Sequence, residues 1–573
     1  MTIPVVRSLA DDIDDWLGSA PPETGSDLDV PGADDHERRR LALIGGIARG
    51  LVDDAVIAAW PKAVRAWATG VGTPPAELVA RIRSQLDARS DPIAAMYEGS
   101  ISGRSRRSLG TFFTPPAVVD FMLDAARRLL PSPATVIDPG AGVGAFTIAA
   151  AKRWPHAELV AVDVNVVTLG LLAARGAQLR TRLHLVHEDF LAWSQSGASE
   201  LPGPRLWIGN PPYTRHQTMA AGARESARRL KTDLVSSGHA GLSAYFLAAI
   251  LQALRPQDAV CLLLPGSWTD TRYGAPLRTK LAAMSQREVG LVAFPSTRQL
   301  FPGTRVTGMV LFVGPQASSS RGMWSATADT VGDKVVASPA TARSRDELPD
   351  GGFGIWLWRR AESAPDQPVA LGSLATVRRG VATGANRFFL MTDAEASSIP
   401  SHYLRRAVRS LRGIPGYRLD QSQHDEIGRL GRRRWLLEVP GGTDPEADAG
   451  LAEWSRLAKT EVQATYIGSH REHWYSVEHV EPPDILLSPM GKGQMRSVRN
   501  LVRAVPSNAI YGLYLFDRAP DVADSLCEWL NSPDGQSGLL LRARAYGAGL
   551  FKLEPRDVRN VRVPGYLKDT ASR

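Results

Sequence analysis

The chain has 573 residues, of which 44% are hydrophobic and 22% are charged. These values are typical of a folded globular protein with two or three large domains, and they exclude a disordered or fibrous chain. No apolar run is long enough to cross a bilayer and no secretory signal opens the sequence, so we expect a cytoplasmic protein with no membrane partner. Two cysteines, Cys261 and Cys527, exclude a disulfide framework and a multi-cysteine zinc site.

The formal net charge of +8 is unevenly distributed along the chain. The first 40 residues carry a net charge of −6, so the remaining residues carry +14. The cationic residues are 58 arginines and nine lysines, and arginine is the better ligand for phosphates and guanine edges, although a GC-rich genome also favours it. The charge therefore favours a polyanionic partner.

Two regions precede the first predicted strand. Residues 1–36 are acidic and rich in glycine, proline and serine, which predicts a flexible tail. Between residues 37 and 104 apolar side chains recur at helical spacing, as at Leu41, Ile44 and Ile47. We therefore expect an N-terminal helical region of two or three helices.

Residues 105–315 alternate between predicted helices and strands. A helix is expected to begin near Pro115, because proline is tolerated in the first turn. The expected strands are 135–138, 158–163, 183–187, 206–209, 260–264 and 306–313, and the expected helices between them are 145–153, 166–174 and about 243–254. This alternation of apolar strands and helices predicts an α/β fold with a doubly wound, mostly parallel sheet, whose ligand lies at the carboxyl ends of the strands.

The last part of the chain has a different pattern. Residues 316–350 are polar and rich in glycine, proline and serine, which predicts a linker or a long loop. Residues 351–573 lack the strand–helix alternation and contain many tryptophans, tyrosines and arginines. We expect them to form a separate α+β domain.

A glycine-rich turn follows the first predicted strand and opens the next helix. In this turn Asp138 precedes Gly140, Gly142 and Gly144, and such glycines let a ligand approach the backbone at a helix start that favours negative charge. Asp163 ends the next strand, where a carboxylate can accept both hydroxyls of a ribose. Together these residues predict a nucleoside-containing cofactor, and their G-x-G-x-G spacing differs from the dinucleotide pattern.

The tetrapeptide Asn210-Pro211-Pro212-Tyr213 follows the fourth predicted strand, at the same edge of the sheet. Because two consecutive prolines stiffen the backbone, the Asn210 side-chain oxygen and the Pro211 carbonyl can face one point. Two such acceptors hold both hydrogens of an amino group and draw its conjugated nitrogen toward tetrahedral geometry, which frees the lone pair. Tyr213 offers a flat face for stacking a heterocycle. The tetrad therefore indicates chemistry at an amide- or purine-type amino nitrogen.

Motif by motif, residues 108–315 resemble the gamma-type, TaqI-like adenine-N6 DNA methyltransferases, which have the class I S-adenosylmethionine-dependent methyltransferase fold. The resemblance implies that S-adenosylmethionine is the cofactor. Its methionine part would contact Thr114, its amino group would face Asp138, and its ribose would bind Asp163.

The same resemblance assigns the remaining site residues. Asp189 would bind the adenine amino group of the cofactor, and Phe190 would lie beside the adenine ring. The residues 210–213 would form the catalytic tetrad, in which Tyr213 stacks on the target base. Phe301, in the segment Leu300-Phe-Pro-Gly-Thr-Arg-Val, would stack on the other face of that base. An enzyme that acts on a base inside a duplex must first rotate it out of the stack.

Residues 379–388 and 547–564 resemble the opening and closing segments of target-recognition domains in this family. Such domains read base edges in the major groove, typically with arginine on guanine. The candidate DNA-binding residues are Arg379, Arg387, Arg432, Arg433, Arg434, Arg542 and Arg544. A solvated run of charge explains the arginines at 432–434, 542 and 544 equally well.

The resemblance implies a site-specific DNA methyltransferase that methylates N6 of a flipped-out adenine in a short double-stranded recognition sequence. It would be the modification half of a restriction–modification system. The sulfonium is already an activated methyl donor, so no metal is expected, and catalysis would rest on positioning and hydrogen bonds. The expected partners are double-stranded DNA and a separate cognate restriction endonuclease, and the chain itself would be a monomer or a dimer.

Alternative functions use the same motifs. An RNA adenine or protein glutamine methyltransferase would carry this tetrad, although the basic surplus and the more than 220 residues after position 350 favour DNA. A bifunctional restriction–modification enzyme would carry a nuclease, but none of the nine lysines has an acidic residue two positions before it, as the usual metal-dependent nuclease requires. A DNA-binding subunit with an inactive methylase fold would have lost Asn210 or Tyr213, and both are present.

Overall fold

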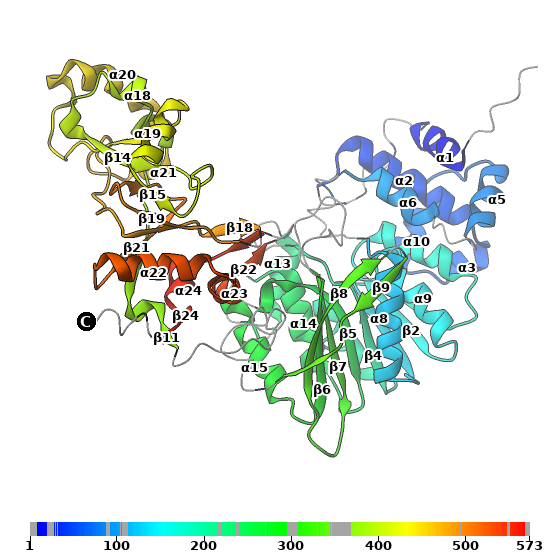
Figure 1. Cartoon of the computed structure of the whole chain (residues 1–573). Helices are drawn as coiled ribbons and strands as arrows, with labels where there is room; N and C mark the ends of the chain where they lie inside the picture. The colour runs from blue at the N-terminus through cyan, green and yellow to red at the C-terminus, as the bar shows by residue number, and fades with distance from the viewer. Residues whose placement is uncertain are drawn as a thin grey trace, which may run out of the picture. The chain divides into compact units, whose positions relative to one another are not determined.

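The computed structural model divides the chain into two units, Met1–Leu357 and Trp358–Arg573 (Figure 1). The structure describes all residues except 1–7, 20–23, 25–27, 29, 31, 87–91, 103–104, 106–112, 215–218, 220, 231, 236–239, 270, 295–307, 332, 344, 346–367, 493, 547–549, 566 and 568–573.

The first unit is built around a ten-stranded sheet with the strand order β10-β8-β6-β7-β5-β4-β1-β2-β3, in which β9 pairs with β8. The five neighbouring strands β5, β4, β1, β2 and β3 are parallel to one another. Strand β7 lies between β5 and β6 and is antiparallel to both. The strands are β1 Thr135–Pro139, β2 Glu158–Asp163, β3 Leu183–His187, β4 Arg205–Gly209, β5 Ala259–Pro265, β6 Arg287–Ala293, β7 Gly308–Gln316, β8 Met323–Val331, β9 Lys334–Ala337 and β10 Thr341–Arg343. The predicted α/β fold with a doubly wound, mostly parallel sheet is confirmed.

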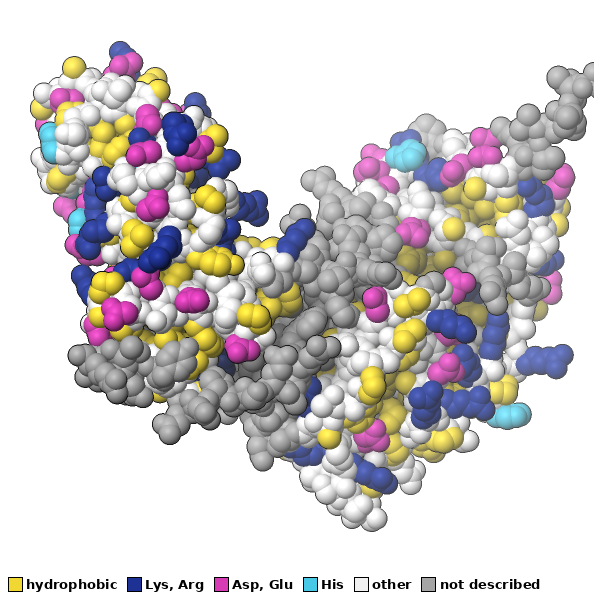
Figure 2. All heavy atoms as spheres, viewed as in Figure 1, with side chains coloured by type: hydrophobic (Ala, Val, Ile, Leu, Met, Phe, Trp, Pro, Cys, Tyr) yellow, Lys and Arg dark blue, Asp and Glu magenta, His cyan; other side chains and the backbone are white. Residues whose placement is uncertain are grey.

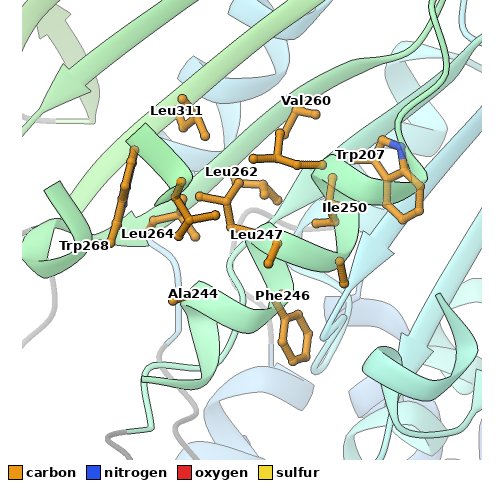
Figure 3. Close-up of a cluster of buried hydrophobic side chains, with 14 of the residues drawn as sticks. Trp207, Ala244, Phe246, Leu247, Ile250, Val260, Leu262, Leu264, Trp268 and Leu311 are labelled. Carbon is orange, nitrogen blue, oxygen red and sulfur yellow. The ribbon is translucent and has the colours of Figure 1, made fainter. Parts of the chain in front are cut away.

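Helices cover both faces of this sheet (Figure 1). On one face α14 packs its apolar side chains on β4 and β5, and Figure 3 shows Phe246, Leu247 and Ile250 in this cluster with Val260 and Leu262. On the other face α8 and α9 cover the opposite side chains of the same strands. The helices are α8 Pro116–Leu129, α9 Ala145–Arg153, α10 Val166–Gly176, α11 Phe190–Trp193, α12 Gly197–Glu200, α13 Ala221–Arg229, α14 Leu242–Ala253 and α15 Ala275–Ala283. Strands buried on both faces explain the near-continuous apolar runs in the sequence.

The N-terminal helices share a core with α10, at the β3 edge of the sheet. They are α1 Leu9–Gly18, α2 Asp35–Gly50, α3 Asp54–Ala58, α4 Lys62–Thr69, α5 Ala76–Gln85 and α6 Pro92–Ser100. The expectation of a flexible tail over residues 1–36 is wrong for α1, which buries Leu9, Ile13 and Leu17 in this core. These three apolar residues recur every four positions between acidic residues, which is the spacing of an amphipathic helix. The prediction of a flexible tail considered only the acidic composition and not this spacing.

The expectation of a linker or a long loop over residues 316–350 is wrong for the described residues between 323 and 343. Strands β8, β9 and β10 lie in this segment and extend the main sheet, with β8 parallel to β6. The strand β8 reads Met-Trp-Ser-Ala-Thr-Ala-Asp-Thr-Val, so small and polar side chains weaken its apolar pattern. Strand β6, which no predicted element covered, provides the parallel neighbour that holds it.

The second unit is α+β, as expected, and contains two larger sheets with separate cores. The five-stranded sheet has the order β12-β21-β17-β19-β15, and the four-stranded sheet has the order β13-β16-β14-β20. The strands are β12 Ala375–Arg379, β13 Leu390–Met391, β14 Leu404–Val408, β15 Arg418–Leu419, β16 Trp435–Leu437, β17 Ile485–Leu487, β19 Ser497–Asn500, β20 Val505–Pro506 and β21 Tyr511–Leu515. The longer helices are α19 Gln421–Arg429, α20 Ala449–Gln463, α22 Pro520–Asn531 and α23 Pro533–Arg542.

Among the residues with described positions, no helix in either unit combines the length and the hydropathy needed to span a bilayer.

Candidate cofactor and catalytic site

The glycine turn lies between β1 and α9, at the carboxyl edge of the sheet. Gly140, Gly142 and Gly144 have φ angles of +75°, +55° and +87°, which L side chains rarely adopt. The backbone N–H groups of Gly140 and Ala141 both donate to the Val162 carbonyl at the end of β2, at 2.9 and 3.1 Å. The turn is therefore fixed against the neighbouring strand in a conformation that requires glycine.

Asp163 ends β2 directly beside this turn. Its Oδ2 accepts a hydrogen bond from the Gly142 N–H at 2.7 Å, and its Oδ1 accepts one from the Asn165 N–H at 2.8 Å. Burial raises the pKa of Asp163, although these hydrogen bonds and the nearby His187 oppose the shift. A carboxylate held at a strand end against a glycine turn suits a ribose diol, so these residues fit the nucleoside part of S-adenosylmethionine.

Asp138, at the end of β1, is buried with 2% of its surface exposed. Its Oδ2 accepts hydrogen bonds from the Thr147 N–H at 3.1 Å and the Thr147 hydroxyl at 2.7 Å. Burial raises the pKa of Asp138 to about 7, and the charge of Asp163 adds to the shift while the Thr147 hydrogen bonds oppose it. The carboxyl group therefore changes its charge near neutral pH.

The tetrad of residues 210–213 follows β4, which pairs with β1. A Cβ atom added to Gly140 would lie 3.3 Å from Cδ of Pro212, so the tetrad and the glycine turn are in close contact. The Asn210 Nδ2 donates to the Thr114 hydroxyl at 3.0 Å. Tyr213 is buried, and burial raises its pKa well above the ordinary value, so the phenol stays neutral. The structure thus brings together four of the predicted elements: Thr114, the glycine turn, Asp163 and the tetrad.

The pair Asp189 and Phe190 follows β3. Asp189 begins α11, and its Oδ1 accepts a hydrogen bond from the Leu191 N–H at 2.8 Å. Phe190 is buried and stacks on Phe246, with ring centroids 4.6 Å apart. Phe246 in turn approaches the glycine turn, because a Cβ atom at Gly140 would lie 3.8 Å from its ring. Phe301 lies outside the described residues.

Sequence reasoning missed three contributors to this site: Thr147, Asn165 and Phe246. Each was detectable only in part. Asn165 follows Asp163 by two residues at a helix start, which is the position for an N-cap. Thr147 lies in the first turn of α9, and Phe246 belongs to a predominantly apolar helix in which no single residue stands out.

The candidate arginines of the second unit have different surroundings. Arg433 binds both carboxylate oxygens of Glu395 at 2.8 Å, and Arg434 binds Asp393 at 2.7 Å and Asp425 at 2.6 Å. The other paired candidates are Arg379 with Glu554, Arg387 with Glu461 at 3.5 Å, and Arg544 with Asp557 at 3.7 Å. Figure 2 shows the resulting mixture of basic and acidic side chains on the visible face of this unit.

Arg432 and Arg542 differ from these five. Arg432 is exposed, and within the part of the chain that the structure describes it forms no ion pair. Arg542 is half-buried at the end of α23, where burial and the neighbouring Arg562 lower its pKa. Of the three consecutive arginines, only Arg432 is therefore available to an external ligand.

Among the described residues, no three histidine, cysteine, aspartate or glutamate side chains lie close enough together to hold a metal ion. Cys261 is buried in β5 and Cys527 in α22. Burial raises the pKa of Cys261 well above its ordinary value and that of Cys527 to about 12.

Two family models match the chain. The model of the Eco57I restriction-modification methylase matches residues 206–301, which include the tetrad. The model of the C-terminal domain of type II methyltransferase M.Eco57I matches residues 359–573, which form nearly all of the second unit.

Two similar proteins that match most of the chain agree with these family models. Type II methyltransferase M.XamI of Xanthomonas campestris pv. amaranthicola is 26% identical over 472 residues, covering 79% of this chain and 85% of that protein. Type II methyltransferase M.AccI of Acinetobacter calcoaceticus is 20% identical over 484 residues, covering 81% and 86%. Among solved structures, the Type IIL restriction-modification enzyme MmeI in complex with DNA is similar in fold, with a TM-score of 0.54 at 14% identity, over 97% of this chain and 82% of that one.

Proposed function

Because the chain belongs to the gamma-class restriction–modification DNA methyltransferases, we propose that it methylates N6 of an adenine that is rotated out of double-stranded DNA. S-adenosylmethionine is the cofactor expected for such an enzyme. The observation that carries the proposal is the contact between the Asn210–Tyr213 tetrad and the glycine turn at Gly140. This contact supports the proposal, because the candidate amino-group acceptors would then lie beside the residues that would bind the cofactor.

Asn210 and Pro211 would hold the amino group of the target base. The Asn210 Oδ1 and the Pro211 carbonyl each accept one N–H of the adenine, which draws the nitrogen toward tetrahedral geometry. The bound cofactor supplies a methyl group already activated on a sulfonium. Transfer of this methyl group to the N6 lone pair would release the neutral thioether, and the N6 proton would pass to solvent. Rate enhancement then comes from in-line positioning and from hydrogen bonds that strengthen in the transition state.

Thr114 would fix the orientation of the Asn210 amide. Because the Asn210 Nδ2 donates to the Thr114 hydroxyl, this hydrogen bond would hold the amide in the orientation in which Oδ1 accepts from the base. Tyr213 and Phe301 would stack on the two faces of the flipped adenine and replace the stacking that it loses on leaving the duplex.

We also propose that the loop between β14 and β15 contacts the DNA. Arg432 lies beside the loop between β14 and β15, since a Cβ atom at Gly413 would be 2.6 Å from its Nη1. Arg409 and Arg412 in this loop are also exposed and form no ion pair with any described residue, and 51% of the Tyr417 surface is exposed. Three unpaired guanidinium groups around one loop suit phosphates and guanine edges.

The test uses the purified chain, plasmid DNA and S-adenosylmethionine carrying a labelled methyl group. The expected product is labelled N6-methyladenine in hydrolysed DNA, confined to one short sequence when modified positions are mapped. Total RNA and release-factor protein, incubated in parallel, are expected to remain unlabelled. Label in cytosine, in RNA or in a glutamine side chain would overturn the adenine proposal. DNA cleavage by the chain alone would favour a bifunctional enzyme over one with a separate endonuclease partner.

A further inference from the structure

The N-terminal helices form part of the same core as the cofactor site. Their buried side chains pack with those of α10 and with Ala141 and Val143 of the glycine turn. Packing between α4 and α10 is close, because any side chain at Gly170 would collide with the ring of Trp67. The Trp67 indole N–H donates to the Leu41 carbonyl of α2 at 3.0 Å, which ties α4 to its neighbour. The N-terminal helices therefore pack directly against α10 and the glycine turn of the candidate cofactor site.

Tyr97 carries this contact into the site itself. It lies on α6, its side chain is fully buried, and its hydroxyl accepts a hydrogen bond from the Asn165 Nδ2 at 3.2 Å. The ring of Phe113 packs edge-on against it, with centroids 6.0 Å apart. Burial and the negative charge of Asp163 raise the pKa of Tyr97, so the hydroxyl stays protonated.

Asn165 links Tyr97 to the carboxylate that fits the ribose. Its backbone N–H donates to Asp163 Oδ1 at 2.8 Å, and its side-chain oxygen caps α10 by accepting from the Val167 N–H at 3.0 Å. The remaining polar group of the amide, Nδ2, is the one that Tyr97 holds. Tyr97 therefore holds the side chain of a residue whose amide oxygen caps α10 and whose backbone N–H binds Asp163.

The segment that follows α6 is tied to the same helices. The Ser105 hydroxyl donates to Glu37 Oε2 at 2.6 Å, and the Ser102 N–H donates to Glu37 Oε1. Burial raises the pKa of Glu37, but these hydrogen bonds outweigh it, and the net pKa lies below the ordinary value. A charged Glu37 thus anchors the chain just beyond the helix that carries Tyr97.

We propose that Tyr97 is a positioning residue for cofactor binding, through which the N-terminal helical region completes the ribose end of the site. The inference rests on the assignment of Asp163 as the ribose-binding carboxylate. It gives these helices a function beyond packing: they set the affinity for S-adenosylmethionine without contacting the target base.

The test measures S-adenosylmethionine binding to the full chain by calorimetry for Tyr97→Phe, which keeps the ring and removes only the hydroxyl. Loss of one such hydrogen bond is expected to weaken the Kd by about three- to tenfold. The kcat at saturating cofactor and the KM for DNA are expected to stay within about twofold, because the variant keeps the ring that packs on Phe113 and the lost hydroxyl contacts Asn165, not the tetrad. Tyr475→Phe, at a buried tyrosine of the second unit, serves as the matched control and is expected to bind as the wild type.

A double-mutant cycle separates positioning from general stability. Asn165→Ser keeps a capping oxygen for α10 but removes the Nδ2 donor, so Tyr97→Phe is expected to have no further effect in this background. An unchanged Kd in Tyr97→Phe, or additive effects in the double variant, would overturn the inference. Asp163→Ala tests the ribose assignment separately. If this variant binds S-adenosylmethionine as the wild type does, Asp163 is not the ribose-binding carboxylate. The proposal of adenine methylation is not affected by that result, because it is tested by which base is methylated.

Discussion

At the carboxyl edge of the sheet, Asp138 and Asp163 lie at the ends of their strands and Asn210 follows β4, and the fold brings the three together around one glycine turn. In the second unit, the consecutive residues Arg432 and Arg433 have different environments, one exposed and one paired with Glu395. Parallel strands that end at one edge place the residues after them side by side, whatever the rest of the chain does. The position of an arginine within a run of arginines does not determine whether its side chain is paired, because the carboxylate that pairs with it comes from elsewhere in the chain.

The largest effect is expected at the tetrad. Asn210→Ala should lower kcat by about 10²–10³-fold, because one of two convergent acceptors for the amino group is lost. The Kd for S-adenosylmethionine should change by less than about threefold, as the glycine turn and Asp163 stay in place. Calorimetry and single-turnover methylation measure the two quantities, and a variant that retains turnover would remove Asn210 from the mechanism.

The second prediction concerns Arg432. Arg432→Ala should weaken DNA binding by about tenfold and make the affinity less dependent on salt, because an exposed contact to the nucleic acid is lost. Arg456→Ala on α20 is the control, since this arginine is 75% exposed and lies on another element of the same unit. Titration of labelled duplex at several salt concentrations measures both variants. Equal affinities for the two would show that the loop between β14 and β15 does not contact DNA.

The third prediction concerns Arg434, whose carboxylate partners come from two different helices. Arg434 holds the pKa of Asp393 below its ordinary value and also contacts Asp425. Arg434→Ala should lower the melting temperature by about 2–4 °C, whereas Arg432→Ala should leave it unchanged. Thermal unfolding of the two variants sharpens the contrast between neighbouring arginines. A reversed order of melting temperatures would contradict the separation into structural and DNA-binding residues.

The smallest effect is a pH dependence at Asp138. Its pKa of about 7 means that Asp138 of the cofactor-free protein becomes a carboxylate as the pH rises through 7, and the cationic amino group that is proposed to face it would bind that form. The affinity for S-adenosylmethionine should therefore rise by about fivefold from pH 6 to pH 7, and Asp138→Asn should abolish this rise. The free energy of unfolding without cofactor should instead decrease as the pH rises toward 7. The reason is that the folded protein binds the Asp138 proton more tightly than the unfolded chain does, and this proton is lost above pH 7. Calorimetry at several pH values tests the first statement, and a flat wild-type profile would contradict it.

The sequence predicts most strands of the first unit and the juxtaposition of the motifs, because apolar runs mark buried strands and strand ends share an edge. It does not predict β8, because the side chains of this strand are small or polar and the strand is held by its parallel pairing with β6. Nor does it predict the contact of Tyr97 with Asn165, which joins residues 68 positions apart through packing of helices. The pairing of Arg433 with Glu395 depends in the same way on tertiary structure. Phe301 lies outside the described residues and stays a prediction.

The most direct test of the central claim is a structure of the chain bound to its mapped recognition duplex and a cofactor analogue without a transferable methyl group. The account predicts a flipped adenine whose N6 lies within about 3.2 Å of both the Asn210 Oδ1 and the Pro211 carbonyl, with Tyr213 stacked on its ring. A specific complex in which the adenine stays in the helix, or in which N6 lies beyond hydrogen-bonding distance of Asn210, would contradict it.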